Sequence, residues 1–189
     1  MIIAVDGPAA SGKGTIARAL ARHYRLPCLD TGLLYRAVGL SVLKAGGDPD
    51  READALTACA FADSLLDDPV LRSEAVGALA SRVSVHQHVR DALIRRQRDF
   101  AEQPGGAILD GRDIGTVIAP DADAKIFVTA SVHVRARRRF NEALANGATP
   151  DMDSLIADIQ ARDTRDMSRD HAPLKVADGA DLLDTSDLT

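Results

Sequence analysis

The sequence contains few aromatic residues and few cysteines. Aromatic side chains make up 3% of its 189 residues, tryptophan is absent, and there are two cysteines. Two tyrosines and four phenylalanines are too few to stack several bases of single-stranded nucleic acid. Cys28 and Cys59 fit neither a metal-binding pattern nor a disulfide framework, so we expect two reduced thiols that pack in a cytoplasmic protein.

An excess of positive charge and a long apolar stretch are also missing. The chain has 23 Lys and Arg residues against 28 Asp and Glu residues, a net charge of −5. This balance excludes a mainly polycationic nucleic-acid binder. No apolar run approaches the roughly 20 residues that span a bilayer, and the N-terminus lacks a signal-peptide pattern. We therefore expect a cytoplasmic protein with small-molecule partners, and neither nucleic acid nor a membrane among them.

The hydrophobic residues, 46% of the chain, form short apolar runs between segments of helical periodicity. The apolar runs predict strands at 2–5, 28–29, 107–109, 125–129 and 181–184. The periodicity predicts helices at 15–24, from about 33 to 46, and at 52–66, 73–81, 86–100, 132–146 and 151–170. Continuous apolar strands are typical of a parallel sheet that is buried on both faces. The predicted fold is therefore α/β, a five-stranded parallel sheet flanked by helices in a single domain, 1–189.

A glycine-rich segment lies between the first predicted strand and the first predicted helix. It reads Gly7-Pro8-Ala9-Ala10-Ser11-Gly12-Lys13 and is followed by Gly14 and Thr15. This is the context of the phosphate loop of P-loop NTPases, in which backbone N–H groups, a helix N-terminus and the lysine bind phosphates. We expect residues 7–15 to bind the phosphates of ATP.

One position departs from the general phosphate-loop pattern. Gly14 stands where Ser or Thr usually follows the lysine, which puts a direct contact between that hydroxyl and magnesium in doubt. The ending Gly-Lys-Gly-Thr is typical of nucleoside monophosphate kinases. Thr15 and Asp110 are the expected Mg²⁺ residues, with Asp110 acting directly or through water. The alternative for Asp110 is a carboxylate that caps the following turn.

Four further motifs follow along the chain. They are Asp30-Thr31-Gly32-Leu33-Leu34-Tyr35-Arg36, Ala80-Ser81 with Arg90, Asp110-Gly111-Arg112-Asp113-Ile114-Gly115-Thr116-Val117, and Arg162-Asp163-Thr164-Arg165-Asp166-Met167-Ser168-Arg169 before Ala172-Pro173-Leu174. In this order they resemble the motifs of the bacterial cytidylate kinase family, and the resemblance extends over nearly the full length of the chain. The resemblance implies a transferase that moves the γ-phosphoryl group of ATP, with Mg²⁺, to CMP or dCMP. The products would be ADP and CDP or dCDP, in pyrimidine nucleotide metabolism.

The resemblance also implies roles for single residues. Lys13, Arg112 and Arg169 would be catalytic. The phosphate of CMP would be held by Arg36, Arg112 and Arg169, the cytosine by Ser81, Arg90 and Asp113, and the sugar by Arg162 and Asp166, with Thr31 also at the substrate.

The chemistry of these residue types agrees with those roles. The acceptor phosphate is already ionised and needs no general base, whereas arginine forks suit two polyanions. A carboxylate can accept from N4 of cytosine and an arginine can donate to N3 and O2. Uracil reverses this pattern at positions 3 and 4, so CMP should be preferred to UMP.

The resemblance divides the chain into a core (about 1–45, 100–135 and 172–189), a monophosphate-binding region (about 46–99) and a lid (about 146–170). The monophosphate-binding region is shorter than is usual in the family and reads as helical. The resemblance also implies a further helix after Leu183-Asp184-Thr185, where the sequence stops. We expect a monomer, since such kinases need no partner to build their site.

Three other interpretations stay open at this point. One is a pyrimidine monophosphate kinase that also accepts UMP, and another is an ATP-binding module that has lost turnover through its shortened region and tail. The third is an RNA-associated factor that uses a basic cluster, although a helix bordering the ATP site or a solvated face explains the cluster better. That cluster is Arg135, Arg137, Arg138 and Arg139. His86 and His88 lack a third ligand and are expected to be surface residues that open a helix.

Overall fold

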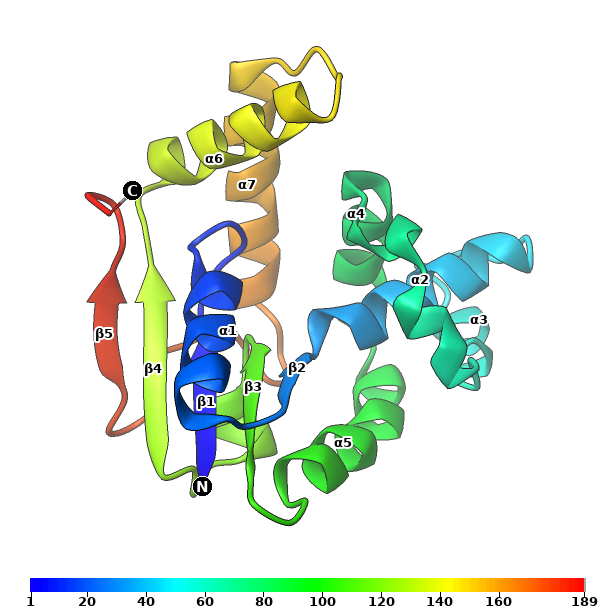
Figure 1. The fold of residues 1–189 in the computed structure, drawn as a ribbon. Helices are drawn as coiled ribbons and strands as arrows, with labels where there is room; N and C mark the ends of the chain where they lie inside the picture. The colour runs from blue at the N-terminus through cyan, green and yellow to red at the C-terminus, as the bar shows by residue number, and fades with distance from the viewer. Residues whose placement is uncertain (189) are drawn as a thin grey trace.

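A single parallel sheet forms the centre of the computed structural model, which describes residues 1–188 (Figure 1). Across these residues the sheet has five strands in the order β2-β3-β1-β4-β5, and every neighbouring pair is parallel. The strands are β1 (Ile2–Asp6), β2 (Cys28–Asp30), β3 (Ala107–Gly111), β4 (Ala124–Thr129) and β5 (Asp181–Asp184). The α/β fold predicted from the sequence is confirmed; Thr189, the end of the predicted core segment, lies outside the described residues.

The two central strands, β1 and β3, carry functional loops at their carboxyl ends. Every residue of β3 is buried, which explains why its sequence is apolar without alternation. The register pairs Val5 with Asp110 and Asp6 with Gly111, so both strands end at the same level. Because all strands run in the same direction, the segments that follow β1, β2 and β3 meet at one edge of the sheet.

Helices cover both faces of the sheet. Helix α1 (Lys13–Tyr24) packs Ala17 and Leu20 onto the face that presents Val5 and Ile108. The other face is covered by α5 (Gln87–Ala101) and by a short π-helical turn, η3 (Ile114–Ile118), with Ile114 against Leu109. Each fully buried aliphatic side chain stabilises this arrangement by about 1.5–3 kcal/mol.

A helical lobe stands beside the sheet and has its own apolar core (Figure 1). It contains α2 (Gly32–Lys44), α3 (Glu52–Thr57), the 3₁₀ turns η1 (Asp63–Asp67) and η2 (Pro69–Arg72), α4 (Glu74–Val83) and the start of α5. The predicted helices at 73–81 and 86–100 are confirmed. The predicted helix at 52–66 is wrong, because α3 ends at Thr57 and the chain turns so that Phe61 and Leu66 each pack against two apolar clusters.

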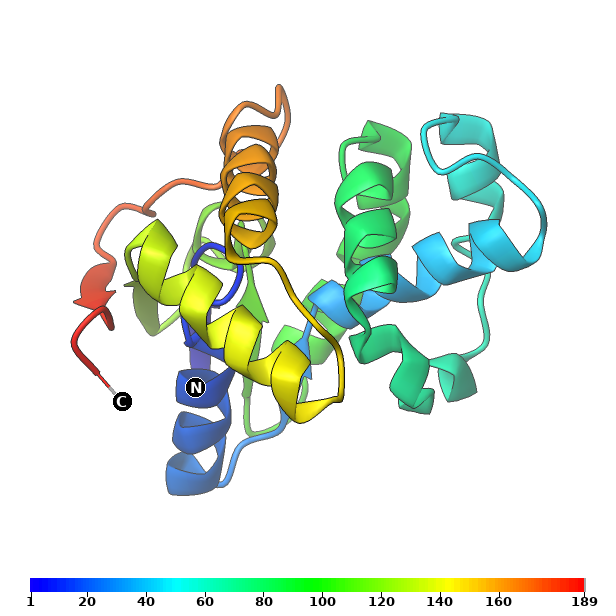
Figure 2. The same ribbon diagram turned by 90° about the horizontal axis from the view of Figure 1, so that it is seen from above.

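Two helices, α6 (Val132–Ala145) and α7 (Met152–Met167), follow β4 and pack against each other through Ala136, Leu155 and Ile159. Ser131 accepts the N–H of Val134 at 3.4 Å and begins α6, as the sequence predicts. Viewed onto the carboxyl edge of the sheet, α7 stands between the sheet and α4 (Figure 2). The lobe and the sheet therefore face each other across α7.

The cysteine and histidine predictions are confirmed only in part. Cys59 is partly buried against the lobe, but Cys28 is exposed at the start of the edge strand β2, so its prediction as a packing thiol is wrong. His88 is exposed, whereas His86 is half-buried with its Nε2 2.9 Å from the carbonyl oxygen of Pro49. None of the helices within residues 1–188 is long and apolar enough to cross a membrane.

Candidate active site

The glycine-rich loop lies between β1 and α1, as predicted. At Gly7, with φ +153°, a Cβ would fall 2.0 Å from the carbonyl oxygen of Val128, so the close approach to β4 requires glycine. Ala10 and Gly12 also have positive φ, at 59° and 90°, which curls the backbone into a compact loop. Consecutive N–H groups in such a curled loop, directly before a helix, form a concave anion-binding surface.

Two arginines of the basic cluster support this loop from outside. Arg135 is buried and donates from Nη1 to the carbonyl oxygen of Ala9 at 3.2 Å and to Oδ1 of Asp163 at 3.0 Å. Arg138 donates from Nη1 to the carbonyl oxygen of Ala10 at 3.4 Å. The cluster is therefore not one solvated basic face; it joins the loop to α7, and Arg137 is its exposed member.

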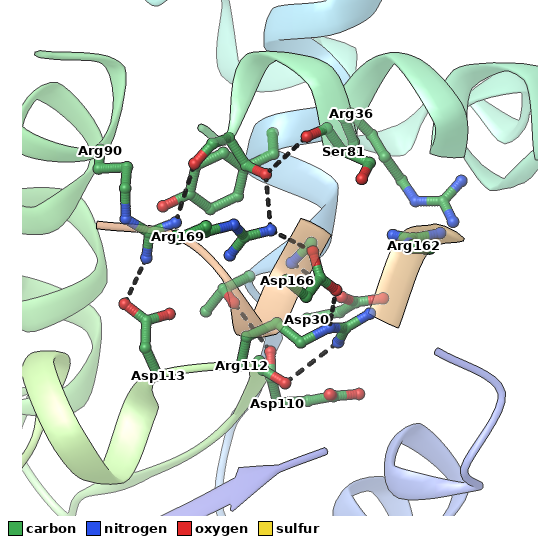
Figure 3. Close-up of a pocket in the computed structure, with 16 residues that line it drawn as sticks. Asp30, Arg36, Ser81, Arg90, Asp110, Arg112, Asp113, Arg162, Asp166 and Arg169 are labelled. Carbon is green, nitrogen blue, oxygen red and sulfur yellow. Dashed lines mark hydrogen bonds and ion pairs between the residues drawn. The ribbon is translucent and has the colours of Figure 1, made fainter. Parts of the chain in front are cut away.

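Two cavities adjoin at the carboxyl edge of the sheet. The outer cavity is lined by the loop and by basic side chains: Ala10, Gly12, Lys13, Gly14, Thr15, Arg18, Asp30, Leu33, Arg36, Arg72, Arg138, Arg139 and Glu142. The inner pocket lies deeper, and Figure 3 shows its charged side chains pointing toward one another. Asp30 and Arg36 line both spaces, so a ligand in one would lie next to a ligand in the other.

The inner pocket brings the predicted substrate residues together. It is lined by Asp30, Thr31, Gly32, Tyr35, Arg36, Ala80, Ser81, Ser84, Arg90, Asp110, Gly111, Arg112, Asp113, Arg162, Asp166 and Arg169. These residues come from β2, β3, α2, α4, α5 and α7 and from the short segments that follow β2, β3, α4 and α7. The pocket therefore depends on the lobe and α7 both facing the sheet.

Lys13 and Asp110 meet at the junction of the loop and β3. Lys13 Nζ lies 3.4 Å from Asp110 Oδ1. Burial lowers the pKa of Lys13, and burial raises the pKa of Asp110, while the opposite charge of each partner acts against these shifts. A Cβ at position 14 would fall 3.0 Å from Asp110 Oδ2. A side chain at position 14 would therefore have to displace the Asp110 carboxylate slightly.

The Asp110 carboxylate suits a divalent cation that is shared with phosphate oxygens. Its buried Oδ1 lies 3.4 Å from Lys13 Nζ and makes no other polar contact within the described residues. The predicted Thr15 is exposed and lines the outer cavity. In the part of the chain that the structure describes, no cluster of three His, Cys, Asp or Glu residues could hold a metal on its own. Mg²⁺ is commonly bound by one or two carboxylates together with substrate phosphates, so this donor set fits it.

Asp166 of α7 holds two arginines of the inner pocket. Its Oδ2 lies 3.1 Å from Nε of Arg112, and its Oδ1 accepts from Nη2 of Arg169. Burial alone would raise the pKa of Asp166, but Arg112, Arg169 and Arg162 together hold it below its usual value. The carboxylate therefore fixes both guanidinium groups before any ligand binds.

Arg162 and Arg36 are less fully neutralised than the other arginines of the pocket. Burial and the nearby charge of Arg112 lower the pKa of Arg162 to about 9, and its buried Nε has no hydrogen-bond partner among residues 1–188. Arg36 donates from Nη1 to the carbonyl oxygens of Leu71 and Ser73 at 2.6 and 2.9 Å. Neither arginine has an ion pair within residues 1–188, so this side of the pocket suits a negatively charged group.

Arg90 and Asp113 form a buried ion pair at the far end of the inner pocket (Figure 3). Arg90 also donates from Nη1 to the carbonyl oxygen of Ser84 at 3.2 Å, and its Cζ lies 5.5 Å from the ring centroid of Tyr35. Nearer the sheet, the Thr31 hydroxyl donates to the carbonyl oxygen of Asp110 at 2.9 Å. The pair presents a donor and an acceptor side by side, an arrangement that suits the edge of a polar ring.

Arg165 and Ser84 are not among the predicted site residues. Arg165 donates from Nη1 to Ser81 Oγ at 2.6 Å, and the predicted Arg169 donates from Nη2 to Ser84 Oγ at 2.9 Å. These bonds tie α7 and the residues just after it to the end of α4. Arg165 lies within the arginine-rich motif 162–169, so its position was the available signal, whereas Ser84 follows the end of α4 and gave none.

Known proteins resemble this chain along its full length. A family model described as "Cytidylate kinase" matches residues 3–189. A cytidylate kinase from Brucella suis biovar 1 is 53% identical over 189 residues, covering 100% of this chain and 86% of the relative. Another, from Rhodopseudomonas palustris strain BisA53, is 57% identical over 189 residues, covering 100% and 90%. A solved structure of an uncharacterized protein from Eubacterium ventriosum matches with a TM-score of 0.54 at 14% identity, covering 99% of this chain and 89% of that one, a likeness in fold alone.

Proposed function

The chain belongs to the cytidylate kinase family, and we propose here how its residues divide the work of that family's reaction. It is a P-loop transferase that moves the γ-phosphoryl group of ATP to CMP or dCMP, giving ADP and CDP or dCDP. The observation that carries the proposal is the junction of the two cavities at Asp30 and Arg36. ATP phosphates in the outer cavity and a nucleoside monophosphate in the inner pocket would meet there.

The donor phosphates bind the loop of residues 7–15. Its N–H groups and the N-terminus of α1 supply fixed positive poles, and Lys13 adds a full charge at the junction with the inner pocket. Arg138 and Arg139 border the same cavity from α6. Because these groups are held in place before ATP binds, they need little reorganisation during transfer.

The acceptor phosphate binds Arg36, Arg112 and Arg169. Its oxygen attacks the γ-phosphoryl group without a general base, so catalysis rests on positioning and on stabilising charge in the transition state. Arg112 and Arg169 are preorganised by Asp166, and Lys13 approaches from the donor side. These three cations, Lys13, Arg112 and Arg169, are the catalytic residues of the proposal.

Cytosine is read by Asp113 and Arg90, with Ser81 in support. Asp113 accepts from the N4 amino group, and Arg90 donates to N3 and O2. Uracil would place an acceptor against the Asp113 carboxylate in a buried site, and this mismatch favours CMP over UMP. Thr31 lines the same pocket, and Arg162 and Asp166 contact the sugar from α7.

The chain acts as one domain and as a cytoplasmic monomer that binds neither nucleic acid nor membranes. The core is about 1–45, 100–135 and 172–189 and contains the strands of the sheet. The reduced monophosphate-binding region is about 46–99 and forms the helical lobe together with α2. The segment 146–170, which includes α7, is a lid that closes over the phosphates and excludes water, which would otherwise hydrolyse ATP.

Magnesium would be held between Asp110, Thr15 and the ATP phosphates. When bound, it supplies charge that neutralises the β- and γ-phosphate oxygens. Asp110 would offer its buried carboxylate, directly or through water, and Lys13 Nζ lies 3.4 Å from it.

ADP formation tests this proposal when Mg-ATP is supplied with CMP, dCMP, UMP or AMP singly, beside an ATP-only control. Turnover with CMP and dCMP well above the other substrates is expected. A chain that binds ATP but phosphorylates none of the four substrates would contradict the proposal. Equal turnover of CMP and UMP would contradict the roles of Asp113 and Arg90 in reading the base.

A further inference from the structure

The carboxylate of Asp6 lies at the end of β1, directly before the phosphate loop, and is 4% exposed. Its Oδ1 accepts the backbone N–H of Ile114 at 2.9 Å, and its Oδ2 accepts the N–H of Gly115 at 2.8 Å. These are the first two N–H groups of η3, which have no partner inside that helical turn. Asp6 therefore caps a helical turn that lies more than 100 residues further along the chain.

The residue at the N-cap position of η3 is Asp113, which makes no side-chain capping bond. Aspartate is favoured at N-caps because its carboxylate accepts N–H groups of the first turn. Here the Asp113 carboxylate pairs instead with Arg90 in the inner pocket. Asp6 thus accepts the N–H groups that an aspartate at the position of Asp113 would ordinarily accept.

We propose that Asp6 is a positioning residue for base recognition: by capping η3 in place of Asp113, it leaves the Asp113 carboxylate free to face Arg90 and the base. This inference rests on the proposed function, specifically on Asp113 as the residue that reads cytosine. Asp6 also directly precedes Gly7, so one residue borders both the phosphate loop and the turn that carries Asp113.

Burial acts against the charged form of Asp6. It raises the pKa of this carboxylate to about 6, although the N–H groups of Gly115 and Ile114 act in the opposite direction. The charge of Asp113 raises the pKa further, and that of Arg112 lowers it. Both carboxylate oxygens are nevertheless needed as acceptors, because each receives one of the two N–H groups.

The test is a double-mutant cycle read out as substrate preference. Asp6→Asn, Asp113→Asn and the double variant are compared with the wild type by the ratio of kcat/KM for CMP to that for UMP. An amide nitrogen cannot accept an N–H, so Asp6→Asn leaves a capping bond unmade, which Asp113 can supply by turning away from Arg90. We expect Asp6→Asn to lower the ratio by about tenfold. In the Asp113→Asn background the same change should have no effect on the ratio.

A matched control comes from the other end of β1. Asp123 accepts the N–H of Ile2, the first residue of β1, at 2.7 Å, whereas Asp6 is the last residue of that strand. Asp123 does not line the pocket, so Asp123→Asn should leave the ratio unchanged. Asp6→Glu is the second test variant, for use if Asp6→Asn does not fold. It keeps both acceptor oxygens but adds a methylene that displaces η3, and it should also lower the ratio.

Two results would overturn the inference. One is a folded Asp6 variant, by near-ultraviolet circular dichroism, whose CMP to UMP ratio equals that of the wild type. The other is an equal fall of the ratio in both backgrounds, which would mean that Asp6 does not act through Asp113. Failure of the proposed function is seen separately, as a wild type that does not turn over CMP.

Discussion

Replacing Asp166 with asparagine should destabilise the protein strongly, because two buried guanidinium groups would lose their counter-charge. The Asp166 side chain is 2% exposed, and those of Arg112 and Arg169 are 17% and 6% exposed. Removing one partner of a buried ion pair typically costs about 3–5 kcal/mol. Asparagine preserves the volume and one acceptor, so we expect a loss of about 3 kcal/mol in the free energy of unfolding.

Urea denaturation at pH 7.5, followed by circular dichroism, measures this loss. The control is Asp50→Asn, which removes a carboxylate that accepts from Nε of Arg82 at 2.8 Å on the protein surface. Those two side chains are 63% and 40% exposed, and an exposed pair contributes about 0–1 kcal/mol. The two variants remove the same chemical group, so the difference between them reports the effect of burial.

The pH dependence provides a second check on Asp166. The arginines around it lower its pKa in the folded protein below the unfolded value near 3.8, despite its burial. The stability that it contributes is thus fully present above about pH 4 and is lost as pH falls through the lowered pKa. The gap between wild type and Asp166→Asn should be constant from pH 8 to 5 and should narrow below 4. A variant within 1 kcal/mol of the wild type at pH 7.5 would refute this account of the pocket.

Three further predictions concern single residues of the site. Asp113→Asn should move the kcat/KM preference from CMP toward UMP, since an amide can donate to O4 of uracil; an unchanged ratio would remove Asp113 from base reading. Because burial raises the pKa of Asp6 from 3.8 to about 6, the protonated form stabilises the fold below about pH 4, and this stabilisation is lost as pH rises through 6. Urea denaturation should show the wild type losing up to about 3 kcal/mol relative to Asp6→Asn between pH 4 and 7, and a gap independent of pH would contradict the shift. Arg162→Met should lower kcat/KM for CMP at least about tenfold without lowering the thermal midpoint of unfolding, because it removes a desolvated charge that has no carboxylate bonded to it within residues 1–188. A variant with a lower midpoint and full activity would show that Arg162 serves stability and not substrate binding.

The parts of this structure that could be predicted from sequence are those set by neighbouring residues. The apolar runs at 2–5 and 107–109 correspond to buried central strands, and the glycine pattern from Gly7 to Lys13 corresponds to the loop between β1 and α1. Ser131 before an apolar periodic segment is a local N-cap signal, and it caps α6. Each of these features depends on periodicity or backbone preference within about one element.

The features that sequence reasoning missed depend on residues that are distant in the chain. The helix predicted at 52–66 ends at Thr57, and the chain that follows turns so that Phe61 packs against two apolar clusters of the lobe. Arg135 reads as part of a basic cluster, yet its partners Ala9 and Asp163 lie 126 and 28 residues away. The capping of Ile114 by Asp6 spans 108 residues. Such contacts exist only once the distant segments that make them have been brought together by the fold.

The pairing of charges in the inner pocket determines how it can bind a phosphate. Arg112 and Arg169 are held by Asp166, so a substrate phosphate must compete with that carboxylate for them. Arg36, the third arginine proposed for the acceptor phosphate, donates only to backbone carbonyl oxygens and has no ion pair within residues 1–188. Under the proposed function an incoming phosphate therefore gains most at Arg36, while Asp166 limits how tightly Arg112 and Arg169 can hold it. Because Asp166 lies in α7, the helix proposed as part of the lid also sets how readily the phosphate is released.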